Sequence, residues 1–196
     1  MNKKNISLIV ILGLVVIVVI WAISAYNGLV TKSENCSSQW SKVESQYQRR
    51  SDLIPNLVNT VKGYAKHENN TLLEVVTARN QATGTKVDAN KLDSKSIQNY
   101  QKSQDNLSSA ISKLMVVVER YPDLKANQNF LELQSQLEGT ENRIAVERQR
   151  FADVVKAYNV KIKRFPTNII ASCFSFEQKA YFEAQKGSEN APKVEF

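Results

Sequence analysis

The chain begins with a stretch of uncharged, apolar residues. Positions 6 to 23 read ISLIVILGLVVIVVIWAI and contain no charged side chain. A helix of about 20 apolar residues crosses a hydrocarbon core of roughly 30 Å, and Trp21 falls where an interfacial aromatic belt would lie. The pattern predicts a transmembrane helix from Ile6 through Trp21 to Ile23. Residues 1–25 are therefore interpreted as a short tail and a membrane anchor.

A cleaved signal peptide is the alternative interpretation of the same segment. Ala22-Ile23-Ser24 before Ala25 resembles a small-residue cleavage site. The apolar run is longer than the usual stretch of about 7–15 residues in signal peptides. Its length favours an anchor that is retained.

Beyond the anchor, apolar residues recur every seven positions in two interleaved series, the a/d pattern of helices that pack side by side. The series are Trp40, Tyr47, Ile54, Val61 and Val43, Arg50, Leu57, Tyr64. Their phase is unchanged across Pro55, so we expect a kink there and not an end. The pattern predicts a helix over about 27–67, with His67 in its last turn.

Three more helices are predicted downstream. The spacing in Thr71-Leu-Leu-Glu74 is that of a capping box, and it opens a helix over about 71–83. A third helix over about 94–121 ends at Pro122, and a fourth covers about 128–165. Heptad positions of the last two are Ile97, Gln104, Ile111, Val118, Tyr100, Leu107, Leu114, Tyr121 and Phe130, Leu137, Ile144, Phe151, Tyr158.

Amphipathic helices joined by short links bury their apolar stripes against one another. The predicted fold class is all-α: an N-terminal transmembrane helix followed by an up-down four-helix bundle of long amphipathic helices over residues 26–166. Residues 167–196 are predicted to form a short apolar segment and an extended C-terminal tail.

A polar layer is expected inside this bundle. Arg50 occupies an apolar heptad position, and the up-down arrangement places it level with Gln104 and with residues 140–147. A buried charge without a partner costs several kcal/mol, so Arg50 is expected to pair with Glu147 or Gln104. One arginine with one glutamate supplies neither a nucleophile nor a carboxylate pair, so the layer is interpreted as structural.

Two surface features suggest binding. The polar run 46–52 places Arg49 and Asp52 on a face that we interpret as a protein interaction surface. The end of the fourth helix returns to the membrane and carries Lys156, Lys161, Lys163 and Arg164, which anionic lipid would attract by about 1 kcal/mol each. The apolar stretch 165–176 that follows is too short to cross a membrane, but it could touch the interface. Alternatively, the basic residues only complement the helix dipole.

Composition disfavours several functional classes. The chain has 26 Lys and Arg against 19 Asp and Glu, a net charge of +7 that is scattered and lacks a nucleic-acid reading motif. With one histidine and two cysteines, no metal cage or cofactor is expected. His67 lacks a nucleophile pattern, so no enzymatic activity is expected. Cys36 and Cys173 are expected to be free, buried thiols.

Charges flanking the anchor give a narrow estimate of its orientation. Lys3 and Lys4 precede it, and Lys32 and Lys42 follow within the next twenty residues. The denser pair is the first, which by the positive-inside rule favours a cytoplasmic amino terminus and an extracytoplasmic bundle.

Several stretches of the chain resemble the LemA family. They are YNGLV at 26–30, the long run from WSKVESQYQRR to YAKHE at 40–68, YPDLKAN at 121–127, TENRIA at 140–145, RFP at 164–166 and the tail from FEA at 182–184 to APKVEF at 191–196. The resemblance implies a bacterial cell-membrane protein with one N-terminal span, a helical bundle and no established catalytic activity. It also implies an amino terminus outside the cell, opposite to the charge count.

These observations lead to two functional hypotheses. The first is a non-enzymatic, membrane-anchored scaffold or adaptor that recruits unidentified protein partners or self-associates as a homo-oligomer. The resemblance adds a membrane metalloprotease as one candidate partner and links a magnetosome-associated branch to membrane shaping. The second hypothesis is anionic-lipid binding or membrane shaping through the basic end of the fourth helix and residues 165–176.

Overall fold

The computed structural model describes residues 3–183 of the 196-residue chain. The helices are α1 (Lys3–Tyr64), α2 (Asn69–Gly84), α3 (Ser94–Val118), α4 (Pro122–Lys125), α5 (Gln128–Lys163) and α6 (Thr167–Cys173). No strand occurs in this described part, and the predicted all-α class is confirmed. Residues 1–2 and 184–196, which include most of the predicted extended tail, lie outside the described residues.

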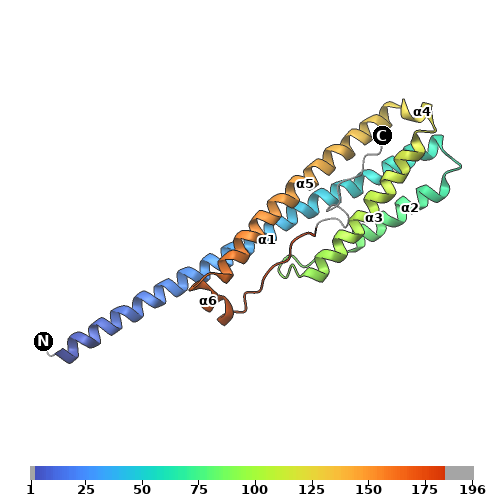
Figure 1. The fold of residues 1–196 in the computed structure, drawn as a ribbon. Coiled ribbons are helices and arrows are strands. Elements are labelled where there is room, and N and C mark those ends of the chain that lie inside the picture. Colours follow the sequence, from blue (N-terminus) through green and yellow to red (C-terminus); the bar gives the residue numbers. More distant parts are fainter. Residues whose placement is uncertain (1–2, 184–196) are drawn as a thin grey trace, which may run out of the picture.

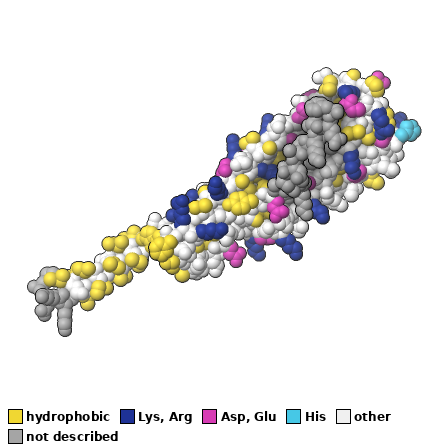
Figure 2. Space-filling view, viewed as in Figure 1, with side chains coloured by type: hydrophobic (Ala, Val, Ile, Leu, Met, Phe, Trp, Pro, Cys, Tyr) yellow, Lys and Arg dark blue, Asp and Glu magenta, His cyan; other side chains and the backbone are white. Residues whose placement is uncertain are grey.

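α1 is one uninterrupted helix that carries both the apolar N-terminal segment and the first helix of the bundle (Figure 1). It is the one described helix apolar enough to cross a membrane, and its apolar part is not buried by the rest of the chain. Figure 2 shows this part projecting from the bundle. From residue 5 onward, Ala25 is the first buried residue of α1. The sequence analysis treated anchor and bundle helix as separate elements, but only Gly28 disfavours helix near their junction, by about 1 kcal/mol.

Four long helices run alternately away from and towards the anchor (Figure 1). α1 packs closely with α5 and α2, and α2 packs with α3. The short helix α4 turns the chain between α3 and α5 at the end farthest from the amino terminus. The heptad positions form the core, which consists of one cluster around Trp40 and Phe151 near the anchor and a second around Leu57 and Leu114 farther out.

Several helix ends differ from the prediction. α1 ends at Tyr64, which leaves that side chain 45% exposed although it continues the heptad series. The predicted capping box is wrong, because Thr71 lies within α2 and the N-cap residue, Glu68, makes no side-chain cap bond. Pro122 starts α4, where its missing N–H costs nothing. Asn127 caps α5 by accepting a hydrogen bond from the backbone N–H of Phe130 at 3.1 Å.

The chain after α5 turns back along the bundle. α6 packs against α1 and α5 at the end where the anchor enters. Residues 174–183, which we call the strap, then run without helix or strand structure towards α3 (Figure 1). The strap fills the space between α5 and α3, two helices that are not among the closely packed pairs.

Candidate interaction sites

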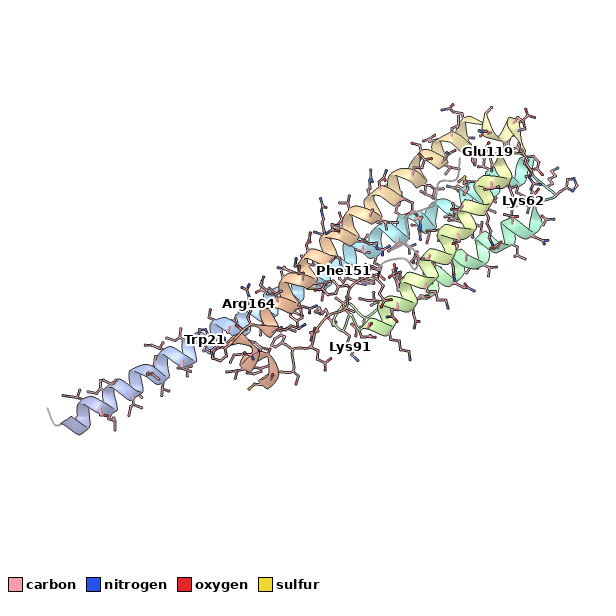
Figure 3. All side chains as sticks on the ribbon, viewed as in Figure 1. Trp21, Lys62, Lys91, Glu119, Phe151 and Arg164 are labelled. Carbon is pink, nitrogen blue, oxygen red and sulfur yellow. The ribbon has the colours of Figure 1, made fainter. Side chains whose placement is uncertain are left out.

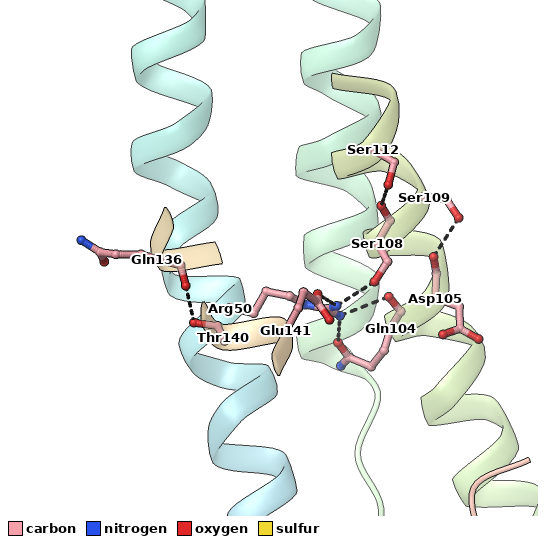
Figure 4. A network of polar contacts seen from close by, with 9 residues as sticks. All are labelled: Arg50, Gln104, Asp105, Ser108, Ser109, Ser112, Gln136, Thr140 and Glu141. Atoms are coloured by element: carbon pink, nitrogen blue, oxygen red, sulfur yellow. Dashed lines mark hydrogen bonds and ion pairs between the residues drawn. The ribbon is translucent and has the colours of Figure 1, made fainter. Parts of the chain in front are cut away.

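Arg50 forms a polar layer in the middle of the bundle (Figure 4). Its side chain is 1% exposed, and both terminal nitrogens of its guanidinium donate to oxygen atoms, whereas Nε has no partner among the described residues. It donates to the backbone oxygen and to Oε1 of Gln104 at 3.1 and 2.8 Å, and to Oγ of Ser108 at 2.7 Å. It also forms an ion pair with Glu141 of α5. The layer therefore links α1, α3 and α5 at one level.

The structure brings Arg50 to Gln104 but not to Glu147. Arg50 lies 14 residues before the end of α1, and Glu141 lies 13 residues after the start of α5, so the two side chains lie at one level. Glu141 falls within the range 140–147 expected at this level, whereas Glu147 lies about 9 Å farther along α5. Glu147 instead accepts hydrogen bonds from Gln39 at 2.5 Å and from Arg150 at 2.7 Å.

An open groove follows α1 and α5 on the outside of the bundle. Its two adjoining sections have volumes of about 680 and 390 Å³. The lining residues are Glu44, Ser45, Gln48, Arg49, Asp52, Leu53, Asn56, Asn59, Thr60, Asn129, Glu132, Leu133 and Gln136. Most of them carry amide, hydroxyl or charged groups. We call this feature the α1/α5 groove.

Arg49 and Asp52, the predicted interaction residues, both line the α1/α5 groove and are exposed. Asp52 accepts a hydrogen bond from Gln48 at 2.7 Å. Arg49 has no ion-pair partner within residues 3–183. Its charge is thus available to a ligand in the groove.

Basic and apolar side chains gather where the anchor enters the bundle. Lys156, Lys163 and Arg164 are exposed there, and Lys161 is half-buried. Figure 3 places Arg164 at the same end as Trp21, whereas Lys62 and Glu119 mark the opposite end. Figure 2 shows dark blue side chains gathered at this junction.

α6 and the residues on either side of it add exposed apolar side chains to this end of the molecule. Phe165, Ile169 and Phe174 are 81%, 52% and 58% exposed. Tyr26 of α1 contacts Phe174, with ring centroids 4.8 Å apart. The short apolar segment of the sequence analysis therefore joins the base of the bundle and also presents apolar groups outward.

The sequence analysis did not assign a contact site to the strap. In the structure the strap makes more numerous directed contacts than the α1/α5 groove or the basic end of the bundle. Phe182 stacks on Trp40 at 5.6 Å between ring centroids, and the guanidinium of Arg148 lies 4.4 Å from the centre of its ring. Asn159 and Gln101, both buried, bond to the backbone of the strap. In the sequence, each is an amide residue next to an apolar heptad position. Many exposed amides share that pattern, so it does not identify a binding residue.

Lys179 of the strap is 5% exposed and donates from Nζ to the backbone oxygen of Asn90 at 2.9 Å. Burial lowers the pKa of Lys179, although the neighbouring Cys36, Glu34 and Asp88 act in the opposite direction. A lysine with a lowered pKa destabilises the folded state while it is protonated, and this cost disappears as the pH rises from the folded pKa towards that of the unfolded chain. Docking of the strap therefore includes a desolvation cost at neutral pH.

The potential metal ligands and the two thiols bear directly on the sequence-based expectations. Between residues 3 and 183, no group of three or more His, Cys, Asp or Glu side chains is placed to hold a metal ion. Cys36 and Cys173 are both free. Cys36 is buried, and burial raises the pKa of its thiol. The expectation of two buried thiols is wrong for Cys173, which lies at the end of α6 and is exposed.

The chain is similar to one protein family and to several known proteins. The model of the LemA family matches residues 39–196. Magnetosome protein MamQ 1 of Paramagnetospirillum magneticum is 24% identical over 183 residues, which cover 84% of this chain and 66% of that protein. Magnetosome protein MamQ of Magnetospirillum gryphiswaldense is 24% identical over 185 residues with the same coverage.

A further relative is Protein LemA of Metamycoplasma hominis, which is 25% identical over 160 residues, or 82% of this chain and 69% of that protein. The chain spans about two thirds of the length of the MamQ proteins it matches.

Proposed function

The chain belongs to the LemA family, and from this premise we propose that it is a non-enzymatic scaffold of the bacterial cell membrane. Residues 1–25 anchor it, and the bundle presents its surface to protein partners. The charge count favours an extracytoplasmic bundle. A membrane metalloprotease is one candidate among these partners.

The continuity of α1 is the observation that carries this proposal. A helix rises 1.5 Å per residue, so the 40 residues of α1 from Ala25 to Tyr64 extend about 60 Å. Because no loop separates the anchor from the bundle, the orientation of the bundle follows that of the anchor helix. The same helix lines the α1/α5 groove with Arg49 and Asp52. A partner that binds the groove would thus be held at a defined height above the bilayer.

Replacing Arg49 by alanine tests the role of the α1/α5 groove. We expect capture of partners by the full-length protein, measured by proximity labelling in cells, to fall about tenfold, as for a charged contact at the centre of an interface. Arg49 is exposed and unpaired within the described residues, so the helical content should stay unchanged.

Arg143→Ala is the matched control for Arg49→Ala. Arg143 is equally exposed but lies on α5 outside the groove, so its removal should leave the labelled proteins unchanged. Equal losses of labelling in the two variants, or a parallel loss of helicity in Arg49→Ala, would count against recruitment through the groove.

The exposed apolar residues at the base support a second candidate function, binding to anionic lipid. None of the side chains from residue 5 to residue 24 is buried, so residues 26–196 keep nearly the whole described core. Flotation of this fragment with anionic vesicles should show binding, and Phe165→Ser should weaken it about tenfold, because one phenylalanine buried in the interface contributes about 1.5–3 kcal/mol.

Val116→Ser provides the control for Phe165→Ser. Val116 is 72% exposed on α3, in the half of the bundle far from the anchor, and its replacement should not change flotation. Absence of binding to anionic vesicles, or equal binding to neutral ones, would remove the lipid hypothesis.

A further inference from the structure

The strap is held by backbone contacts of the kind that bind an extended peptide. Oδ1 of Asn159 accepts from the N–H of Lys179 at 3.0 Å, and Nδ2 donates to the carbonyl of the same residue at 2.8 Å. Gln101 makes the equivalent pair of bonds with Glu183, at 3.0 and 2.9 Å. Two buried amides, one on α5 and one on α3, thus satisfy both backbone groups of strap residues four positions apart.

Side-chain pockets add sequence selectivity to these backbone contacts. Phe182 lies between the ring of Trp40 and the guanidinium of Arg148, with its edge towards Phe151 at 5.6 Å. Figure 3 shows Phe151 pointing from α5 into the middle of the bundle. The Nζ of Lys179 reaches a backbone oxygen in the connection between α2 and α3. We call the surface that these groups form the strap seat, and it selects a lysine followed three positions later by an aromatic residue.

Within residues 3–183, the strap is joined covalently to the bundle at the end of α6. Ser175, at the start of the strap, has a φ of 55°, in the left-handed region, and marks the change from helix to extended chain. From Glu177 to Glu183, every hydrogen bond that the described strap makes goes to α3, α5 or the α2–α3 connection. The N–H of Phe176 donates to the carbonyl of Ala171 at 2.9 Å, so a strap that swings out after Phe176 would leave the seat and keep the end of α6 intact.

We propose that the strap seat also accepts the strap of a second copy of this chain, so that neighbouring copies in one membrane exchange straps and associate. An identical segment reproduces every contact of the seat, which makes exchange a route to dimers with little loss of energy. Because α1 is continuous, anchored copies carry their seats at the same height, and each strap starts at the end nearest the membrane. The inference deepens the proposed scaffold function by naming one partner, but it rests on a different surface.

Two tagged copies of the full-length protein can test strap exchange. The donor copy carries benzoylphenylalanine in place of Tyr181, a strap residue that is 42% exposed beside Phe182. The acceptor copy has a different tag and no photoreactive group. After co-expression and irradiation of membranes, we expect a covalent product with both tags, and peptide mapping should place the cross-link on the seat formed by α3 and α5.

Variants of the seat separate exchange from chance proximity. The acceptor variant Gln101→Ala with Asn159→Ala should reduce the dual-tagged product about tenfold, since it removes both amide pairs. Gln128→Ala with Asn142→Ala, exposed amides of α5 outside both the seat and the α1/α5 groove, is the matched control and should have no effect. Phe182→Ala in the donor should reduce the product equally, which decides the outcome if the seat variant does not fold.

Only intramolecular cross-links, or a dual-tagged product that neither the seat variant nor Phe182→Ala reduces, would overturn strap exchange. Partner capture through Arg49 is measured separately, so failure of exchange and failure of the scaffold role are distinguishable.

Discussion

Replacing Trp40 by alanine should lower the free energy of unfolding by about 3–5 kcal/mol, the usual cost of truncating a buried tryptophan. Trp40 is fully buried, and its ring meets Tyr100, Phe151 and Phe182 at centroid distances of 5.2, 5.4 and 5.6 Å. It thus joins three helices and the strap in one aromatic cluster. Denaturant titration of the full-length protein in detergent micelles, followed by circular dichroism, measures the loss.

Trp40→Phe separates the contribution of ring packing from that of side-chain volume. A phenyl ring retains much of the stacking, and within residues 3–183 the indole N–H of Trp40 is buried without a hydrogen-bond partner, so no bond is lost. We expect Trp40→Phe to lower the free energy of unfolding by about 1–2 kcal/mol. If the alanine variant were no less stable than the phenylalanine variant, the cluster would not be the centre of the core.

Replacing Glu141 by alanine should destabilise the protein by about 2–3 kcal/mol, although its side chain is 48% exposed. The reason lies with its partner, because Arg50 would remain charged and 1% exposed with only neutral acceptors around it. The value is below the roughly 3–5 kcal/mol of a fully buried pair because water reaches Glu141. The same denaturant titration applies.

A double variant shows whether the charge of Arg50 causes this loss. Arg50→Met keeps an unbranched side chain in the core and removes the charge. The double variant Arg50→Met with Glu141→Ala should therefore be more stable than Glu141→Ala alone. Replacing a buried ion pair by apolar residues is often neutral or stabilising. Glu119→Ala, in an exposed ion pair with Lys125, is the control and should cost at most about 1 kcal/mol. A double variant no more stable than Glu141→Ala alone would contradict the role given to the buried charge.

The polar layer and the strap together hold the long helices of the bundle in fixed positions. The layer fixes the level of α1 against α3 and α5, and the strap closes the space between α3 and α5 nearer the membrane. Both act on α1, which also carries the anchor. The outer surfaces of the bundle, including the α1/α5 groove, are therefore held in register with the membrane.

Helix periodicity and hydrophobicity were sufficient to predict most of the fold. The apolar run 6–23 and the heptad series specified the anchor and the buried faces, because both depend only on the regular geometry of the helix. The partner of Arg50 needed the tertiary structure, because the level expected from the sequence, residues 140–147, contains both Glu141 and Glu147. These two residues lie about 9 Å apart along α5, and only Glu141 reaches Arg50.

The sequence by itself determined which residues face the core: Ile144, Phe151 and Tyr158 are buried, as their spacing predicts. Only the tertiary structure decided which side chains meet across helices, and it alone assigned a place to residues 174–183. The physical reason is that a helix imposes its period on the residues that build it, whereas an extended segment has no period of its own. Its position is fixed by Asn159, Gln101 and Trp40, which come together only after the helices have packed.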